Sequence, residues 1–364
     1  NVVGRSRRLL GQAGGRGEYS ALGARQKPRV RCLYAPGRRL VQHSLRAAKH
    51  HRSHQRADGQ QRRRGCGICG PIALAVTEHV IVGELIESVY QRFEHAPLSY
   101  GHGTDNAWDE AVYLVLSVTG FADHESSLQL PVASADYQRV KQLAARRIEE
   151  RAPLAHLLGE CRFMGERFLV EPGVMIPRSP IGYLLGEPLQ AWLGPNAKKI
   201  VDLCAGVGCL GILAAQRYPE SHVTLVELDA QAASLAQQNV ALHNLGDRVL
   251  VVQGDACQWL AEQTDQWDLI LTNPPYVDAP DMKTLPEEYR HEPVLGLAAG
   301  EDGLSLVDRF LPELAERLAA DGVFLCEVGA SAPAMQRKYP DLSIQWLELP
   351  EGGEGVFLLG SGKK

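Results

Sequence analysis

The sequence predicts an α/β protein: a doubly wound, mostly parallel sheet that ends in an antiparallel hairpin and follows a small helical domain. Two observations predict this fold. Beyond Leu193, short apolar runs typical of buried strands alternate with helical stretches. Upstream of Leu193, apolar residues recur at helical spacing. We therefore expect four regions, namely a leader over residues 1–78, a helical domain over 79–160, a hairpin and linker over 161–192, and a sheet domain over 193–364.

The leader is strongly basic. Residues 1–64 contain 17 of the 38 Lys and Arg residues but only Glu18 and Asp58 among the 43 acidic residues, so the rest of the chain carries a net charge of about −20. Its composition is too polar to bury the apolar surface that would offset chain entropy. Because the chain begins with Asn1 and its first methionine is Met164, we expect either a disordered segment or upstream sequence placed before a true start near residues 76–82. An arginine-rich arm that binds RNA phosphates is a third interpretation.

The lengths of the apolar runs and the spacing of the cysteines indicate the cellular compartment. No run of about 18 apolar residues occurs in the sequence, which argues against a membrane-spanning helix. The 8 cysteines are irregularly spaced, which suits free thiols in a reducing cytosol, so we expect a cytoplasmic protein. Cys66 and Cys69 have zinc-knuckle spacing, but no second pair follows and a structural zinc ion needs four ligands. We therefore expect no metal site and no membrane contact.

Three amphipathic stretches predict the helical domain. Trp108–Leu116 and Val140–Ile148 carry apolar residues at helical spacing, and Arg147 is expected to lay its stem along the edge of the second stripe. Glu84–Phe93 predicts a further helix. Around Gly165, alternating apolar and polar residues predict a short hairpin, and prolines mark the linker that follows as loop.

The sheet domain is predicted from apolar runs and the helices between them. Strands are expected at Ile200–Cys204, Val223–Glu227, Val249–Gln253, Leu269–Thr272 and Val323–Glu327. Helices are expected at Cys209–Tyr218, Ala230–His243, Leu304–Ala319 and Ala332–Tyr339. Ile344–Leu349 and Val356–Leu359 flank a glycine-rich loop and predict the terminal hairpin. In such a sheet, ligands bind beyond the carboxyl ends of the strands, so the residues that end the strands are the candidate site.

A glycine-rich loop follows the first of these strands. Gly206, Gly208 and Gly211 have the spacing G-x-G-x-x-G, in which glycines let the backbone approach a ligand at a helix N-terminus. The other loop residues expected to contact a cofactor are Cys204, Ala205 and Val207. Glu227, which ends the second strand, is placed to accept hydrogen bonds from both hydroxyls of a ribose. The loop alone fits a dehydrogenase and a methyltransferase equally well.

Two further acidic residues favour the methyltransferase. Asp202 stands four residues before Gly206, where its carboxylate can pair with the cationic amino group of a methionine moiety but would repel a pyrophosphate. Asp255 ends the third strand, where it can accept a hydrogen bond from an adenine amine. Capping a helix or facing solvent at a strand end is the alternative role for each acid. Together they predict S-adenosylmethionine as the cofactor.

The fourth strand ends in Asn273-Pro274-Pro275-Tyr276, which predicts the chemistry. An amide nitrogen is a poor nucleophile because its lone pair is delocalised into the carbonyl, so its two N–H bonds must be held for the lone pair to face a methyl group. The side-chain oxygen of Asn273, which also borders the cofactor, and the carbonyl of Pro274 offer two acceptors. Pro275 stiffens the segment and Tyr276 can lie over the planar amide. Catalysis would then depend on orientation and proximity, without a general base.

With this motif the chain resembles the protein-glutamine methyltransferases, which modify translation release factors and one large-subunit ribosomal protein. The resemblance runs from about Leu85 to Leu359. It implies a class I methyltransferase-like fold, S-adenosylmethionine as methyl donor, binding of a glutamine by Asn273–Tyr276, and catalytic roles for Asn273, Pro274 and Tyr276.

Two stretches, Tyr100–Glu110 and Ile176–Gly182, are similar to the ribosomal branch of the family. That branch implies methylation of a glutamine in large-subunit ribosomal protein three, contact with ribosome assembly intermediates, and a helical domain that recognises this substrate. Arg178 is expected either to position the target or to brace the linker. The release-factor branch usually has Arg-Pro-Asp-Thr-Glu where this chain has Arg178-Ser-Pro-Ile-Gly, and a release-factor glutamine is the alternative substrate.

Two other functions compete with this interpretation. A DNA or RNA adenine amino-methyltransferase can hold the amine of a flipped base in the same motif, but the acidic body of the chain argues against nucleic acid. A catalytically silent module that only grips a ribosomal protein is the second, and the intact Asn273, Pro274 and Tyr276 argue against it.

Overall fold

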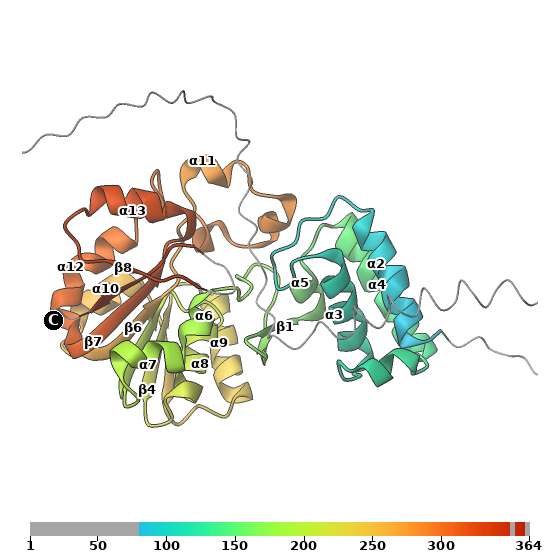
Figure 1. Ribbon diagram of the computed structural model, residues 1–364, viewed down its shortest axis with the longest axis horizontal. Helices are drawn as coiled ribbons and strands as arrows, with labels where there is room; N and C mark the ends of the chain where they lie inside the picture. Colours follow the sequence, from blue (N-terminus) through green and yellow to red (C-terminus); the bar gives the residue numbers. More distant parts are fainter. Residues whose placement is uncertain (1–79, 350–353, 361–364) are drawn as a thin grey trace, which may run out of the picture.

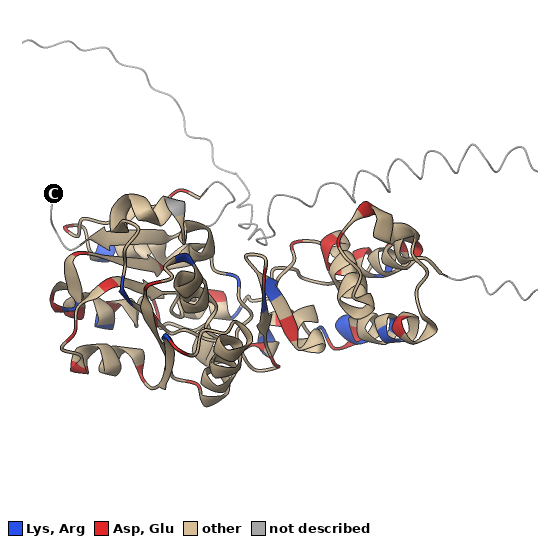
Figure 2. Ribbon diagram, turned by 90° about the horizontal axis from the view of Figure 1, so that it is seen from below, with Lys and Arg blue, Asp and Glu red and all other residues tan. Residues whose placement is uncertain are grey.

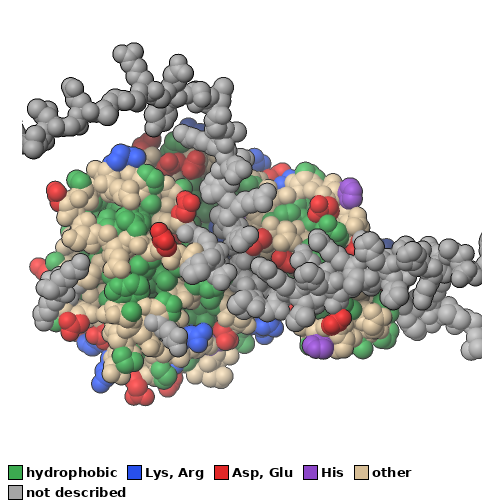
Figure 3. All heavy atoms as spheres, viewed as in Figure 1, with side chains coloured by type: hydrophobic (Ala, Val, Ile, Leu, Met, Phe, Trp, Pro, Cys, Tyr) green, Lys and Arg blue, Asp and Glu red, His purple; other side chains and the backbone are tan. Residues whose placement is uncertain are grey.

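The computed structural model describes residues 80–349 and 354–360. The predicted leader, with Cys66 and Cys69, lies outside these residues. In Figure 1 the described chain forms a helical part and a sheet part joined by a short hairpin, and Figure 2 shows the two parts side by side from below. Within the described ranges, no helix is both long and apolar enough to cross a membrane. Figure 3 shows acidic and hydrophobic side chains intermixed over the described surface that faces the viewer.

The helical part confirms the three predicted helices and adds shorter elements. Its elements are α2 (Val82–Glu94), α3 (Ala107–Thr119), η1 (Glu125–Gln129), α4 (Ser134–Glu149) and α5 (Leu154–Leu158). Helix α3 begins where the Asn106 side chain accepts a hydrogen bond of 2.9 Å from the Asp109 N–H, which satisfies one of the free donors of the first turn. The predicted apolar stripes meet in one core around Leu85, Leu114 and Val140.

The connection between the parts is more helical than predicted. Strands β1 (Glu160–Phe163) and β2 (Glu166–Leu169) pair antiparallel, which confirms the hairpin. The linker, predicted as loop, contains the short helices α6 (Ile181–Leu184) and α7 (Glu187–Leu193). Two of its prolines begin helices: Pro180 immediately precedes α6, and Pro188 lies in the first turn of α7, where a missing N–H costs nothing. Pro172 and Pro177 lie in loop, as predicted.

One seven-stranded sheet forms the sheet part, in the order β5-β4-β3-β6-β7-β9-β8. The strands are β3 (Lys199–Leu203), β4 (His222–Glu227), β5 (Val249–Gln253), β6 (Trp267–Thr272), β7 (Leu318–Glu327), β8 (Gln345–Trp346) and β9 (Val356–Gly360). Neighbours from β5 to β7 are parallel, and β9 is antiparallel to both β7 and β8. This confirms the predicted fold class, with the second strand of the terminal hairpin, rather than the first, joined to the parallel strands.

Helices cover both faces of the sheet (Figure 1). The four predicted helices are present as α8 (Cys209–Arg217), α9 (Ala230–Leu242), α12 (Val307–Arg317) and α13 (Ala332–Lys338). Helix α10 (Ala256–Glu262) was not predicted. Ile200 points into the core shared with α6 to α9, and the next residue, Val201, points into the core shared with α10, α12 and α13. This alternation buries β3 on both sides, as expected of a central parallel strand.

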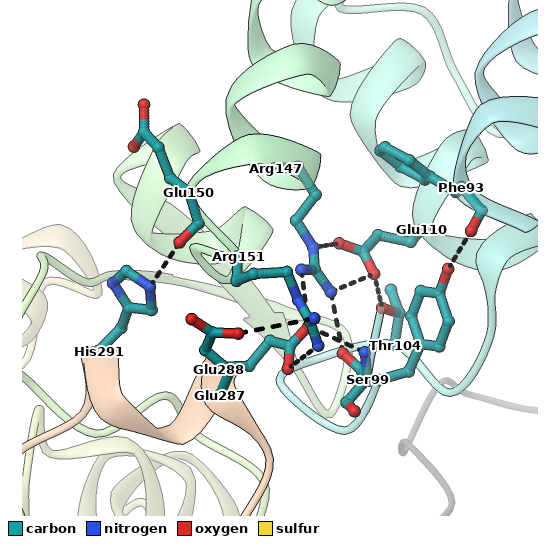
Figure 4. A network of polar contacts seen from close by, with 11 residues as sticks. Phe93, Ser99, Thr104, Glu110, Arg147, Glu150, Arg151, Glu287, Glu288 and His291 are labelled. Carbon is teal, nitrogen blue, oxygen red and sulfur yellow. Dashed lines mark hydrogen bonds and ion pairs between the residues drawn. The ribbon is translucent and has the colours of Figure 1, made fainter. Parts of the chain in front are cut away.

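A long connection after β6 reaches back to the helical part. It contains α11 (Ala279–Met282), η2 (Glu287–His291) and η3 (Val294–Gly296), and η4 (Gly329–Ser331) follows β7. Figure 4 shows η2 against α4. The carboxylate of Glu288, which is fully buried, accepts hydrogen bonds of 2.8 Å from both Nε and Nη2 of Arg151, and one of 3.2 Å from Nη1 of Arg147.

The position of Arg147 corrects a prediction. It was expected along the edge of the α4 stripe, yet only 2% of it is exposed. Its Nε donates to Glu110 at 2.6 Å and its Nη2 donates to the Ser99 carbonyl at 2.9 Å (Figure 4). The cation is buried because α3, the loop before it and η2 all supply acceptors, and these lie far from α4 in sequence.

Candidate functional site

The ends of the parallel strands bring the predicted site residues to one edge of the sheet. In register, Leu203 pairs with Val226 of β4 and with Thr272 of β6. The Thr272 hydroxyl donates a hydrogen bond of 2.8 Å to the Leu203 carbonyl and is fully buried. The glycine-rich loop and the Asn-Pro-Pro-Tyr motif therefore start from two strand ends that are tied to each other by this bond.

The glycine-rich loop turns sharply out of β3. Cys204 has a φ of 59° and Gly208, which precedes α8, has a φ of 85°; this left-handed region is unfavourable for residues with a side chain. A Cβ atom on Gly208 would also lie 2.8 Å from Cδ1 of Leu225. Ala205 and Val207 are buried, so this loop presents backbone rather than side chains to a ligand.

Asp202 lies beneath this loop and is 1% exposed. Its Oδ2 accepts a hydrogen bond of 2.8 Å from the Gly211 N–H, while its Oδ1 has no partner among the described residues. Burial raises the pKa of Asp202 to about 7, partly offset by the Gly211 bond. The carboxylate therefore has one unused acceptor, and a cation beside it would favour its ionised form.

Glu227 fixes the loop from the neighbouring strand. Its Oε2 accepts a hydrogen bond of 2.7 Å from the Gly206 N–H, and its Oε1 accepts one of 2.8 Å from the Asp229 N–H. Burial raises its pKa despite these bonds. Each carboxylate oxygen can accept a second hydrogen bond, so the predicted contact with ribose hydroxyls is compatible with this bracing role but stays a prediction.

Asp255 caps a helix, which is the alternative role that the sequence allowed for it. Its Oδ1 caps α10 by accepting hydrogen bonds from Cys257 N–H at 2.8 Å and Gln258 N–H at 3.0 Å. The same carboxylate pairs with Arg309 at 3.0 Å. Although partial burial opposes the shift, the Gln258 bond and the Arg309 contact lower its pKa. Contact with an adenine amine stays a prediction.

Asn273 and Pro274 leave their acceptors free. Across the described part of the chain, neither the side chain of Asn273 nor the carbonyl of Pro274 has a hydrogen-bond partner. Asn273 is partly exposed and Pro274 is buried. Two oxygens thus lie one residue apart at the rim of the site without a protein donor, which suits a ligand that brings its own N–H groups.

Tyr276 is fixed from several sides. A Cβ atom on Gly329 would lie 2.6 Å from Cε2 of the Tyr276 ring, so the ring packs directly on the backbone there. The Tyr276 carbonyl accepts a hydrogen bond of 2.9 Å from the Ser331 hydroxyl. The charge of Glu327 beside its hydroxyl, together with burial, raises the pKa of Tyr276 well above its usual value.

Arg178 braces the linker. Its Nη1 and Nη2 donate to the two oxygens of Glu292 at 2.5 and 2.7 Å, and Glu292 is buried. His102 lies 3.3 Å from the same carboxylate. Although burial opposes it, the charge of Arg178 holds the pKa of Glu292 well below its usual range. With its guanidinium paired in this way, Arg178 ties the linker to the connection that follows the motif; positioning of a target stays a prediction.

Sequence reasoning missed several residues that shape this site. Thr272 carried a signal, because it is the one hydroxyl residue in the apolar run Leu269–Thr272. Glu292 and Glu327 were not assigned to the site from the sequence. Their partners, Arg178 and Ser179, lie 114 and 148 residues away in sequence, so no local pattern connects them.

The fold and this site define a methyltransferase of class I. The family described as the methyltransferase small domain matches residues 184–287. The ribosomal protein uL3 glutamine methyltransferase of Bordetella pertussis is 40% identical over 280 residues, which cover 76% of this chain and 93% of that protein. The protein of the same name from Francisella tularensis is 38% identical over 267 residues, covering 71% and 83%. The chain belongs to the family of these ribosomal protein uL3 glutamine methyltransferases.

Solved structures match at lower sequence identity. The catalytic domain of hMettl16, in complex with a MAT2A 3′UTR hairpin, is 16% identical, covers 63% of this chain and 83% of its own, and has a TM-score of 0.43. The family and fold together imply a methyl donor of the S-adenosylmethionine type. The glycine-rich loop is open beside Gly206, because apart from Gly206 and its two chain neighbours no described heavy atom lies within 4 Å of the position that a Cβ atom would take there.

Proposed function

We propose that this protein methylates the side-chain amide nitrogen of a glutamine in large-subunit ribosomal protein uL3, with S-adenosylmethionine as donor. The observation that carries the proposal is the pair of unpartnered oxygens on Asn273 and Pro274, at the end of the strand that Thr272 ties to the glycine-rich loop. A primary carboxamide has two N–H bonds, so one acceptor for each is the arrangement its recognition needs. The names of the curated relatives support uL3 as the protein that carries this glutamine.

The protein's contribution to the reaction is orientation. Asn273 Oδ1 and the Pro274 carbonyl would each accept one N–H of the carboxamide, which turns the lone pair of its nitrogen toward the methyl group. When bound, S-adenosylmethionine supplies an electrophilic methyl group on a sulfonium. Tyr276, fixed by Gly329 and Ser331, would close the site against water. The acceptors are neutral and would take no proton before the transition state. As the new N–C bond formed, the methyl–sulfur bond would break, and the nitrogen would lose one of its two protons after transfer.

The methyl donor would be held by the residues around the loop. The unpartnered Oδ1 of Asp202 would take the cationic amino group, Glu227 the ribose and Asp255 the adenine. The backbone of Cys204 to Gly208 would pass along the ligand, because the side chains of Ala205 and Val207 are buried. We further propose that the helical part recognises uL3, before or during ribosome assembly in the cytoplasm.

Transfer of labelled methyl groups tests this function. The protein is incubated with labelled S-adenosylmethionine and unmethylated ribosomal proteins, and the modified residue is mapped by mass spectrometry. Label is expected on one glutamine of uL3. Asn273→Ala should lower the rate on the order of 100-fold or more, because a preorganised acceptor is lost. Asn196→Ala, at an exposed loop position, is the matched control and should keep full activity.

Three outcomes would contradict the proposal. Label on a release-factor glutamine would overturn the substrate, and label on nucleic acid would overturn the substrate class. If Asn273→Ala were as active as Asn196→Ala, the two-acceptor arrangement would not be the basis of catalysis.

A further inference from the structure

A small buried cluster behind Tyr276 joins three distant parts of the chain. Glu327, which ends β7, is 4% exposed. The hydroxyl of Ser179, a linker residue that is 2% exposed, donates a hydrogen bond of 2.6 Å to Oε2 of Glu327. The hydroxyl of Tyr276 lies beside the same carboxyl, whose charge raises the pKa of Tyr276. Because Ser179 and Glu327 are buried, water does not readily replace the bond between them, and its loss leaves a polar group without a partner.

Two other contacts hold Tyr276, and Glu327 is the residue beside its hydroxyl. The ring rests on the backbone of Gly329 along its Cδ2, Cε2 and Cζ atoms, and the backbone carbonyl is held by Ser331. Neither contact binds the hydroxyl itself. That end is held by a carboxylate whose own orientation depends on Ser179. The position of the ring over the candidate carboxamide site is therefore set jointly by the end of β7 and by the linker.

We propose that Glu327 is a positioning residue for methyl transfer, which acts by holding the Tyr276 hydroxyl and so fixes the last residue of the Asn273–Tyr276 segment. The proposal rests on the function proposed above. It assigns Glu327 no contact with either substrate. Its effect should therefore appear mainly in kcat, because a displaced ring alters the reacting geometry more than it alters binding.

The protonation state of Glu327 decides how many bonds it accepts. Burial raises the pKa of Glu327 to about 7, opposed by the hydrogen bonds from Ser179 and Tyr276 and by the charge of Arg178. The titratable or charged groups that face it are Tyr276, Arg178 and the buried thiol of Cys326, whose pKa is raised. Ionised, the carboxylate accepts both bonds. Protonated, it carries an O–H on one oxygen and is a weaker acceptor for both hydroxyls, so activity should fall as the pH drops through about 7.

A double-mutant cycle tests the link. Glu327→Gln, Tyr276→Phe and the double variant are compared with the wild type for kcat and KM on uL3 between pH 6 and 8.5. Each single variant should lose on the order of tenfold in kcat, and the double variant should be no slower than the worse single, because both changes remove one interaction. The ratio of wild-type to Glu327→Gln activity should shrink below pH 7. Titration of Asp202 is common to both proteins and cancels in this ratio.

Several results would overturn the proposal. Wild-type kcat in Glu327→Gln, losses that multiply in the double variant, or a pH-independent ratio would each show that Glu327 does not act through Tyr276. Thermal unfolding and S-adenosylmethionine binding identify a variant that is merely misfolded. If Glu327→Gln is misfolded, the kcat of Glu327→Asp is measured in its place; this variant keeps the charge and should retain part of the wild-type kcat.

The failure of the parent function can be told apart from the failure of this link. If the wild type transfers no methyl group to uL3, the proposed function fails. The link is then tested by ultraviolet titration of Tyr276, read as the difference between proteins with and without its hydroxyl. Tyr276 should ionise at lower pH in Glu327→Gln, because the neighbouring negative charge is gone; an unchanged titration would refute the contact itself.

Discussion

Replacing Arg147 by methionine should destabilise the protein far more than its position on a solvent-facing helix suggests. Methionine keeps much of the aliphatic stem but removes the guanidinium that binds Glu110 at 2.6 Å and Glu288 at 3.2 Å. Glu110 and Glu288 are 2% and 0% exposed, so neither gains water in exchange. The consequences for the two carboxylates differ, and this difference sets how much unfolding free energy is lost.

Glu288 keeps its strongest partner in the variant. Although burial opposes it, Arg151 and the Ser99 N–H hold the pKa of Glu288 low, at about 2, with Arg147 contributing less. Glu110 keeps only a hydrogen bond of 3.3 Å from Thr104. One buried carboxylate is therefore left without a cation, which costs about 3 kcal/mol, the lower end of the range for a broken buried pair. With a urea dependence of about 3 kcal/mol per molar, the unfolding midpoint should fall by roughly 1 M.

Urea unfolding at pH 7, followed by circular dichroism, measures this shift. The matched control is Arg146→Met, one residue earlier on α4, which removes an ion pair with Glu150 whose side chains are both 46% exposed. Exposed pairs of this kind contribute little to stability, so the control should leave the midpoint almost unchanged. Equal midpoints for the two variants would show that the buried Arg147 network contributes no more to stability than the exposed Arg146–Glu150 pair, and would refute the reasoning.

Three further predictions concern the cofactor side of the site. Since burial raises the pKa of Asp202 to about 7, its carboxylate should bind the cationic amino group of S-adenosylmethionine better at pH 8 than at pH 6. Titration calorimetry measures this difference, and Asp202→Asn should bind weakly at both pH values. Gly211→Ala places a Cβ atom 2.1 Å from Cδ2 of Leu225 and should cost about 1–3 kcal/mol in thermal unfolding, whereas an unchanged melting temperature would mean that α8 shifts freely. Asp255→Ala should lose about 1 kcal/mol through the cap of α10 and also weaken cofactor binding, while Arg309→Met, which removes an exposed ion pair, should change stability by about 0.5 kcal/mol or less.

The sequence was sufficient for the parts of the fold that follow from local patterns. Buried parallel strands are continuous apolar runs, so β3 to β7 were found near their observed positions. The glycine spacing and the Asn273 motif mark strand ends, and a doubly wound sheet brings strand ends together whatever lies between them. This is why Gly206, Glu227 and Asn273 were assigned to one edge before any coordinate was known.

Features that depend on distant partners were out of reach. Helix α10 is short, and its start depends on a cap by Asp255 that sequence reasoning assigned to a ligand. The prolines of the linker read as loop, because a proline that begins a helix looks the same in sequence as one that ends it. The burial of Arg147 follows from acceptors on three other segments, one of them 141 residues away.

The docking of η2 on α4 links the helical part to the connection that follows the Asn273 motif. Glu288 of η2 pairs with Arg147 of α4 and with Arg151, which follows that helix. A hinge movement between the two parts would have to separate Glu288 from both arginines. These ion pairs therefore restrain the helical part relative to the sheet part.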